Sequence, residues 1–297
     1  MPQPIPAPRE EGFTTTAGAP LYWAKYGQPD APKLLVLHGG PGADHLYLLP
    51  QMLHLADKHE LLFYDQRGGG RSKSDARIPI TWETHVEDLA SVVQEFELYP
   101  LSIVGYSWGA MLALLYTIQQ RTNPHLRAPD RLALINPAPL TREYRRQFEA
   151  EFARRQQSPD IQRMRDELTA SGLRESDPDA YRQRAFELGV AGYFSDPREA
   201  KDLTPFRVVG RVQQSVWESL GDFDLIHDLT GIRIPSIMIA GRDDPIPLAS
   251  TVEAARALGT DLVVLDECGH VPYVEQPQRL FAALDPFLDE TNPPERS

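Results

Sequence analysis

A serine at position 107 has the surroundings of an activated nucleophile. It is the centre of Gly105-Tyr106-Ser107-Trp108-Gly109, which follows an apolar run over residues 101–104 and precedes a helix-forming run over residues 110–120. Gly-x-Ser-x-Gly between a strand and a helix is typical of a nucleophile elbow, because the glycines leave room for a turn that lifts the serine hydroxyl off the strand end. The helix behind the turn directs backbone N–H groups and its positive dipole end at the same point. The structural alternative is a serine in an ordinary glycine-rich turn.

A serine hydroxyl attacks a carbonyl only when a base accepts its proton and an acid orients that base. Asp244 and His270 follow Ser107 in the chain, and each comes just after a predicted parallel strand. The carboxyl ends of parallel strands meet at one edge of a sheet, so we expect the three side chains to lie close together. Asp243 is the competing candidate for the acid. The histidines that do not follow strands are expected on the surface or on helix faces: His45, His54, His59, His85, His125 and His227.

A second loop, His38-Gly39-Gly40-Pro41-Gly42, follows the apolar strand predicted over residues 33–37. Its glycines let a ligand approach the backbone N–H groups closely. A loop of this kind supplies one donor of an oxyanion hole beside a nucleophile elbow. His38 is expected to brace the loop rather than take part in chemistry, and an ordinary Gly/Pro turn is the alternative.

A third glycine-rich segment, residues 65–72, has the sequence Asp-Gln-Arg-Gly-Gly-Gly-Arg-Ser. It lacks the Gly-Lys-Ser/Thr of a phosphate-binding loop, so nucleotide binding is not indicated. We interpret it as a rigid turn in which Asp65, Arg67 and Arg71 hold one another and the neighbouring loops.

Short apolar runs alternate with helical periodicity along most of the chain, which predicts an α/β fold with a mostly parallel, doubly wound sheet. Strands are expected over residues 12–16, 21–26, 33–37, 60–64, 101–104, 131–135, 234–240 and 261–265. Helices are expected over residues 46–58, 81–98, 110–120, 248–258 and 278–289. In the helix over 81–98, Thr81 is the expected N-cap, and Glu87 and Asp88 belong to the solvated side.

Residues 140–230 differ from the rest, because they contain no clear strand. Helix-start signals stand at Ser158-Pro159, Asp177-Pro178 and Asp196-Pro197, where a capping side chain precedes proline. The chain is therefore expected to have an α/β core over residues 1–139 and 231–297, with a helical cap over 140–230 inserted above the site. Residues 1–10 are expected to form a disordered arm, because four of the first eight are proline.

The composition narrows the classes of function. The 297 residues carry a net charge of −12, which disfavours nucleic acid and anionic membranes as partners. One cysteine, Cys268, precludes an intrachain disulfide, so a reducing, cytoplasmic location is expected. The first residues do not have the pattern of a signal peptide, and no apolar stretch approaches the roughly 18–20 residues of a membrane span. No metal-ligand or dinucleotide-binding motif is present, so no cofactor is expected.

The motifs together resemble the α/β-hydrolase superfamily, and more narrowly its proline iminopeptidase-like group of serine hydrolases. The segments that carry the resemblance are residues 38–42, 65–72, 105–109, 241–244, 269–270 and 275–277. The resemblance implies an α/β-hydrolase fold, with Ser107 as nucleophile, His270 as base and Asp244 as the orienting acid. It also implies an oxyanion hole made by the backbone N–H groups of Gly40 and Trp108.

The substrate is less sharply indicated, because the cap departs from the family pattern. Family aminopeptidases hold the substrate ammonium with carboxylates, but Pro245 follows the catalytic Asp here, and Gln213 and Gln214 stand before Asp222-Phe223-Asp224. Glu218 is the best-placed remaining acid, with Trp217 beside it to line an apolar pocket. The elbow also carries Tyr106 where these aminopeptidases commonly have glycine.

Three functions follow from the resemblance. The first is an aminopeptidase that removes proline or another small apolar residue from short peptides. The second is an esterase, lactonase or amidase of the same fold, and the third is a binding protein that has kept the fold without catalysis. The expected partner is a small molecule or short peptide, and the sequence does not indicate an oligomeric state.

Overall fold

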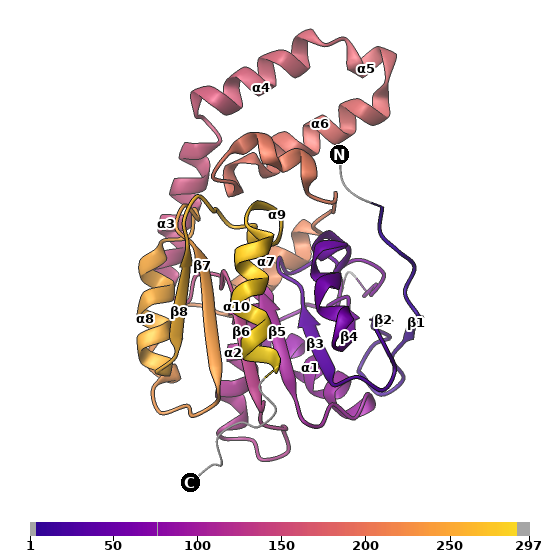
Figure 1. Ribbon diagram of the computed structural model, residues 1–297, viewed down its shortest axis with the longest axis vertical. Helices are drawn as coiled ribbons and strands as arrows, with labels where there is room; N and C mark the ends of the chain where they lie inside the picture. Colours follow the sequence, from indigo (N-terminus) through magenta and orange to yellow (C-terminus); the bar gives the residue numbers. More distant parts are fainter. Residues whose placement is uncertain (1–3, 76, 290–297) are drawn as a thin grey trace.

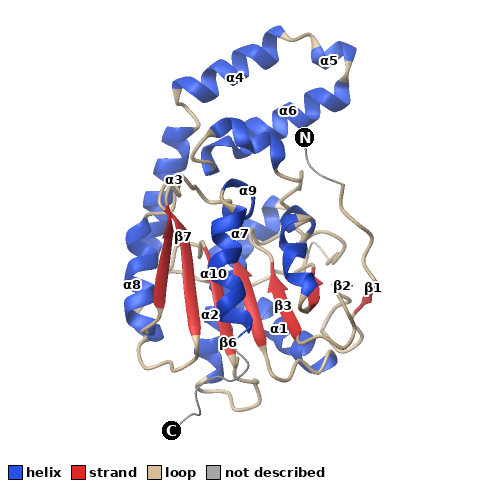
Figure 2. Ribbon diagram, in the orientation of Figure 1, coloured by secondary structure: helices blue, strands red, loops and turns tan. Residues whose placement is uncertain are grey.

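The computed structural model describes residues 4–75 and 77–289, and its centre is one eight-stranded sheet (Figures 1 and 2). The strand order is β1-β2-β4-β3-β5-β6-β7-β8. β2 pairs antiparallel with β1 and β4, and the strands from β4 to β8 are parallel. The strands are β1 (Glu10–Phe13), β2 (Tyr22–Tyr26), β3 (Lys33–Leu37), β4 (Glu60–Tyr64), β5 (Ser102–Tyr106), β6 (Arg131–Ile135), β7 (Ser236–Gly241) and β8 (Asp261–Leu265).

Helices cover both faces of the sheet, which confirms the doubly wound α/β prediction. One face packs against α1 (Trp82–Glu95), α2 (Trp108–Gln120) and α8 (Leu248–Leu258). The other face packs against the 3₁₀ helix η2 (Gln51–Asp57) and α10 (Pro277–Asp289). Because neighbouring residues of a strand point to opposite faces and both faces are covered, β3, β5, β6 and β7 are apolar on both sides after a polar first residue.

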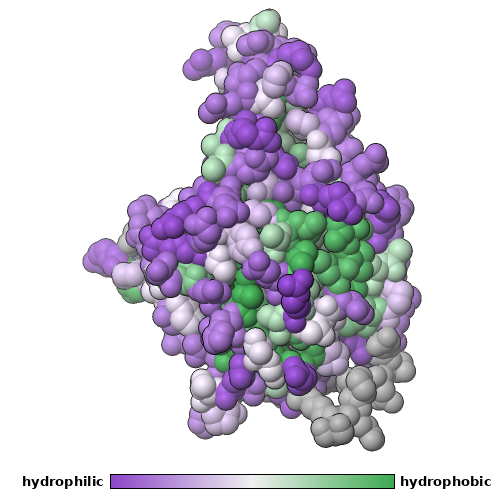
Figure 3. Space-filling model, turned by 90° about the vertical axis from the view of Figure 1, so that its left-hand side faces the viewer, coloured by the Kyte–Doolittle hydropathy of each residue, from purple (hydrophilic) through white to green (hydrophobic). Residues whose placement is uncertain are grey.

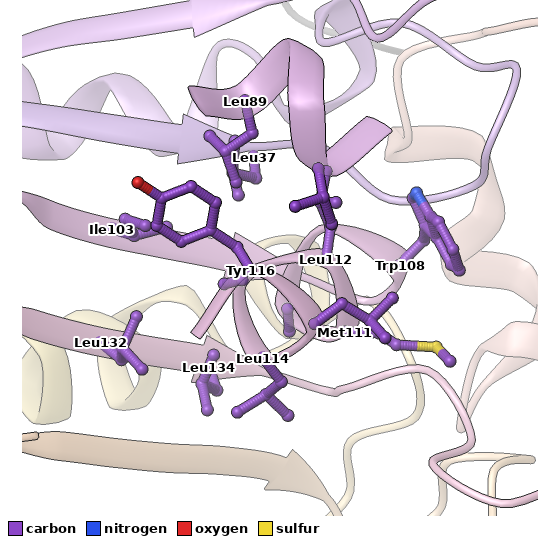
Figure 4. Packing of buried hydrophobic residues seen from close by; sticks show 14 of the residues in the cluster. Leu37, Leu89, Ile103, Trp108, Met111, Leu112, Leu114, Tyr116, Leu132 and Leu134 are labelled. Carbon is purple, nitrogen blue, oxygen red and sulfur yellow. The ribbon is translucent and has the colours of Figure 1, made fainter. Parts of the chain in front are cut away.

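The packing of α2 against the sheet illustrates how the core supports the site (Figure 4). Ten of the helix's thirteen residues are buried, so α2 is apolar on nearly every side. Burying a large aliphatic side chain contributes roughly 1.5–3 kcal/mol, and this helix begins directly behind Ser107. The labelled residues that lie together in this layer are Leu37, Leu89, Ile103, Trp108, Met111, Leu112, Leu114, Tyr116, Leu132 and Leu134.

Two expectations for the first part of the chain need correction. The single helix expected over residues 46–58 is two 3₁₀ helices, η1 (Leu46–Leu48) and η2. Pro50 lies between them, where it has no N–H to donate and disfavours a helical residue before it. The arm expected over residues 1–10 ends in ordered structure: Arg9 donates its backbone N–H to the Lys25 carbonyl at 2.8 Å, and Glu10 begins β1. Residues 1–3 lie outside the described part of the chain.

A helical insertion joins β6 to β7 and rises above the carboxyl edge of the sheet (Figure 1). The three expected helix starts are confirmed, because Ser158, Asp177 and Asp196 each accept a hydrogen bond from a backbone N–H as N-caps. In the view of Figure 3 the projecting end of the molecule is largely hydrophilic. Its elements are α3 (Arg142–Arg155), α4 (Pro159–Ala170), α5 (Leu173–Ser176), α6 (Pro178–Val190), η3 (Ala191–Tyr193), η4 (Pro197–Asp202), α7 (Gly210–Ser219) and η5 (His227–Leu229).

The two ends of the insertion are fastened together at its base. Leu225 donates its N–H to the Leu140 carbonyl at 2.9 Å, and Arg142 donates to the Phe223 carbonyl at 2.9 Å. These bonds form a short antiparallel bridge at Thr141. The chain therefore leaves and re-enters the core at nearly the same place. Across residues 4–75 and 77–289, no helix has the length and apolarity needed to span a membrane.

Candidate active site

Ser107 occupies a strained turn between β5 and α2. Its backbone has φ 54° and ψ −117°, a combination that non-glycine residues seldom adopt and that recurs at functional sites. A Cβ at Gly105 would lie 2.6 Å from the Ala110 Cα, and a Cβ at Gly109 would lie 2.2 Å from the Leu37 carbonyl oxygen. No larger residue fits at either position, which is the physical reason for the Gly-x-Ser-x-Gly spacing.

The structure brings the three predicted side chains together. The Ser107 Oγ lies 3.0 Å from the His270 Nε2, and the His270 Nδ1 lies 2.8 Å from the Asp244 Oδ2. With the carboxylate accepting at Nδ1–H, the neutral ring presents the lone pair of Nε2 to the serine hydroxyl. The side chains of His270 and Asp244 are only 7% and 6% exposed, so water competes little for these contacts.

Asp244, not Asp243, faces His270. The Asp244 Oδ1 accepts the Ile246 N–H at 2.8 Å, and its Oδ2 also accepts the Asn136 Nδ2 at 2.6 Å. The Asp243 carboxylate instead accepts the Ser195 hydroxyl of the insertion at 2.9 Å. Two adjacent aspartates thus point in different directions, one toward His270 and the other toward the insertion.

Asn136 was not singled out from the sequence. It follows β6 with φ 42°, a left-handed conformation that asparagine tolerates better than most residues. Its side-chain amide donates to Asp244 and also to the Gly269 carbonyl at 3.1 Å. An asparagine at the carboxyl end of a central parallel strand is the signal that could have indicated this position.

Two tyrosines hold the His270 ring and its backbone. The Tyr106 hydroxyl donates to the His270 carbonyl at 2.9 Å, and His270 donates its N–H to the Tyr193 carbonyl at 2.7 Å. Both tyrosine rings lie against the imidazole, with centroids 5.3 Å and 5.2 Å away. Burial raises the pKa of Tyr106 well above its ordinary value, so the phenol stays protonated as a donor. Tyr106 therefore has a structural task here that glycine could not perform.

The loop after β3 lies against the elbow. A Cβ at Gly39 would lie 2.7 Å from the Ser107 Cβ, so this glycine permits the close approach. Gly40 has φ 56° and lines the same cavity as Ser107. Trp108 is the first residue of α2, and an N–H at that position has no acceptor within its own helix. Both backbone N–H groups expected in an oxyanion hole are therefore beside Ser107.

His38 braces this loop, as predicted. Its Nε2 accepts the Gln66 N–H at 3.1 Å, and its Nδ1 lies 2.8 Å from the Gly39 carbonyl oxygen. Complete burial lowers the pKa of His38 to about 4, which keeps the ring neutral and consistent with these two bonds.

The turn over residues 65–72 is held differently from the prediction. Asp65 accepts the Arg71 N–H at 2.8 Å and contacts the His45 Nδ1 at 2.7 Å. Arg67 does not pair with them; its Nε donates at 2.8 Å to Asp88, which is buried on α1 rather than solvated as expected. The expectation of surface or helix-face positions is wrong for His45 and His59, which are buried outside the helices, whereas His85 lies on α1 as expected, on its buried side.

A cavity of about 300 Å³ opens at Ser107 and His270. Its walls are mostly aromatic and aliphatic, with Tyr47 and Tyr273 from the core and Phe186, Leu203 and Phe206 from the insertion. None of its lining residues, all within the described ranges, is an aspartate or glutamate. The cavity suits a small apolar group attached to the carbonyl that Ser107 would attack.

The structure does not bring the predicted substrate-binding pair to this cavity. Glu218 is exposed on α7 and accepts a hydrogen bond from Gln214 Nε2 at 2.7 Å. Trp217 packs against Trp108, with centroids 5.3 Å apart. Gln213, on the same helix, lines the cavity instead. In residues 4–75 and 77–289 no three His, Cys, Asp or Glu side chains are grouped as metal ligands would be.

The mostly parallel sheet with serine on a tight strand–helix turn defines an α/β hydrolase. The model of the alpha/beta hydrolase family matches residues 34–284, so the chain belongs to that family. It is 25% identical to a proline iminopeptidase from Heyndrickxia coagulans, over 94% of this chain and 98% of that protein. It is 24% identical to a proline iminopeptidase from Thermoplasma volcanium, over 95% and 97% of the two chains.

Solved structures share the fold over almost the whole chain. A proline iminopeptidase-related protein from Thermus thermophilus superimposes with a TM-score of 0.69 and 24% identity, covering 94% of this chain and 96% of its own. An enol-lactonase from Burkholderia xenovorans gives a TM-score of 0.63 at 20% identity, with coverage of 94% and 100%. At these identities the likeness establishes the architecture alone.

Proposed function

We propose that this α/β hydrolase is a serine hydrolase that works through an acyl-enzyme on Ser107. The observation that carries the proposal is the continuous contact from the Ser107 Oγ to His270 and from His270 to Asp244, at 3.0 and 2.8 Å. As the Oγ attacks a carbonyl carbon, the His270 Nε2 takes the serine proton, and the Asp244 carboxylate stabilises the imidazolium. The N–H groups of Gly40 and Trp108 stabilise the oxyanion. His270 then protonates the leaving group, and water hydrolyses the ester on Ser107 by the same steps.

For the substrate, we propose a short peptide from which proline or another small apolar residue is removed at the N-terminus. The relatives named proline iminopeptidase cover nearly the whole chain, and the cavity of about 300 Å³ has the apolar walls that a pyrrolidine ring requires. A cavity of that size also favours a compact acyl group over a long chain.

One observation favours a second candidate, an esterase, lactonase or amidase with an uncharged acyl group. A cationic α-amine that leaves water needs a compensating charge or hydrogen bonds. The cavity lining contains no carboxylate, and its amide side chain, Gln213, is neutral. Glu218 lies outside the cavity, so it does not supply the charge.

A substrate panel separates the two candidates. Prolyl anilide, N-acetylprolyl anilide and the p-nitrophenyl esters of small carboxylic acids should be assayed side by side, with Ser107→Ala as the matched inactive control. An aminopeptidase hydrolyses the free-amine anilide far faster than the blocked one, whereas equal or reversed rates favour the second candidate. If a fluorophosphonate probe fails to label the parent protein and no substrate is cleaved, the serine hydrolase proposal itself is wrong, and a non-catalytic binding protein becomes the better account.

A further inference from the structure

A carboxylate outside the proposed triad holds the backbone on both sides of His270. Glu275 is the last residue of the short helix α9 (Pro272–Glu275). Its Oε2 accepts the N–H groups of Gly269 and Ser195, each at 2.8 Å, and its Oε1 accepts the N–H of Val271 at 2.9 Å. Gly269 and Val271 flank His270, while Ser195 belongs to the insertion. One side chain therefore joins the histidine loop to the insertion.

We propose that Glu275 is a positioning residue. Its ionised carboxylate sets both the orientation of His270 and the position of the insertion against the histidine loop. The inference rests on the proposed function, in which His270 is the base. An ionised carboxylate accepts at both oxygens, and charge-assisted bonds to backbone N–H groups are stronger than neutral ones. Glu275 accepts N–H groups at both oxygens, and so fixes the backbone on either side of the residue that carries the imidazole.

The insertion and the loop that carries His270 are also in direct backbone contact. A Cβ at Gly269 would lie 2.2 Å from the Tyr193 carbonyl oxygen and 2.9 Å from the Ser195 nitrogen. The insertion therefore touches the backbone of the histidine loop directly, and the His270 N–H also bonds to Tyr193. If the insertion moved away, Glu275 would lose one of its three donors and His270 would lose a backbone partner at the same time.

The surroundings of Glu275 make this arrangement sensitive to pH. Burial raises the pKa of Glu275 to about 7; the three N–H donors oppose this shift, and nearby Glu199 on η4 adds to it. Other titratable groups close by are His270, whose two flanking N–H groups bond to Glu275, Tyr273 on α9, and Cys268 in the histidine loop. Burial and Glu275 raise the pKa of both Tyr273 and Cys268, and Asp243 and Asp244 also raise that of Cys268.

The arginines of the helices that pack against α9 are bonded elsewhere: Arg198 of η4 pairs with Asp196, and Arg279 of α10 donates to the Asp266 carbonyl. His54 of η2 pairs with Asp285 of α10 at 2.9 Å. No ion pair to Glu275 occurs within the described residues, so its three N–H donors are what stabilise the charge. Below about pH 7 protonation places a hydrogen on one oxygen, and the carboxyl group accepts fewer of the three bonds.

The test is the pH dependence of Glu275→Gln, with Glu199→Gln as the matched control on the facing element. The glutamine side chain has only one acceptor oxygen, and its NH₂ group would face a backbone N–H, so that two donors meet and a hydrogen bond is lost. We therefore expect kcat to fall about 10-fold or more, with KM within about 3-fold, because the substrate cavity does not include Glu275. In a plot of kcat against pH, the loss of activity on the acidic side should no longer include the protonation of residue 275. Glu199→Gln removes a like charge without touching the backbone and should shift the parent's loss of activity to lower pH.

A second measurement does not depend on turnover. Amide hydrogen exchange in Ser107→Ala and in Ser107→Ala/Glu275→Gln should show loss of protection at Ser195, Gly269 and Val271 in the double variant. A Glu275→Gln protein with parental kcat, parental pH profile and unchanged protection would overturn the inference, as would a drop in thermal stability with no change in the pH profile. If the parent is not labelled at Ser107, the proposed function has failed instead, and the exchange result still decides the positioning role.

Discussion

Removing the Asn136 amide tests how tightly Asp244 must be held. The Asn136 Nδ2 is 2.6 Å from the Asp244 Oδ2, the same oxygen that faces His270. Glycine is the informative substitution, because φ at this position is 42° and glycine adopts positive φ without steric cost. Alanine would add roughly 1–2 kcal/mol of backbone strain, which would confuse the loss of the hydrogen bond with a loss of stability.

The expected effect follows from the strength of that bond. A hydrogen bond to a charged group contributes about 1.5–3 kcal/mol, equivalent to roughly 10- to 150-fold in rate if all of it orients the carboxylate. The Ile246 N–H still holds the other oxygen at 2.8 Å, and water can enter the vacated space. We therefore expect Asn136→Gly to lower kcat about 10- to 100-fold with little change in KM.

The assay is steady-state kinetics on whichever substrate the panel identifies, with the rate of fluorophosphonate labelling as a second measure of Ser107 reactivity. Asn136→Asp is the contrasting variant, because it tolerates the same φ but places a second carboxylate against Asp244. Like charges at this distance oppose ionisation, so Asn136→Asp should be less active than Asn136→Gly above neutral pH. Parental kcat in Asn136→Gly would refute the argument that Asp244 depends on this donor.

Three further outcomes are expected. Ser107→Ala should lower kcat by on the order of 10⁴–10⁶ and abolish probe labelling; labelling that persists would remove Ser107 as nucleophile. Asp244→Asn should cost roughly 10²–10⁴ in kcat, more than Asp243→Asn, whose carboxylate faces Ser195; the opposite order in parallel assays would reassign the acid. Because the pKa of Glu275 is raised from 4.5 to about 7 in the folded protein, the folded state holds this proton more tightly, so this residue makes the free energy of unfolding fall as pH rises between those values. Denaturant titrations at pH 5 and pH 8 should show that Glu275→Gln reduces this fall, and an unchanged difference would contradict the shift.

The elements that could be predicted are those specified by neighbouring residues. The elbow, the parallel strands and the capped helix starts each depend on a local pattern, so glycine spacing, apolar runs and Ser/Asp-Pro pairs were sufficient. Pro50 was equally visible, but its consequence, two 3₁₀ helices in place of one helix, was missed.

The contacts that could not be predicted join distant segments. Asn136 meets Asp244 across 108 residues of sequence, and no local pattern indicates that pairing. The rotation of α7 is another case, because Val212 and Val216 face the core and thereby turn Gln213 toward the cavity and leave Glu218 exposed. Which acid lies near a substrate depends on that rotation, which tertiary packing decides.

The fastened base of the insertion has a consequence for how this protein can diversify. The bonds at Leu140, Arg142, Phe223 and Leu225 close the segment on itself, so its length adds little to the entropy of assembling the sheet. The insertion supplies much of the cavity wall, while the Ser107, Asp244 and His270 loops all belong to the core. A different helical segment grafted between those closing bonds would change which acyl groups fit without rebuilding the machinery that cleaves them. Substrate preference and bond cleavage can in this sense change separately. The insertion still contacts the catalytic loops in two places: Tyr193 and Ser195 meet the histidine loop, and Arg155 and Ser195 bond to Asp243 beside the proposed acid.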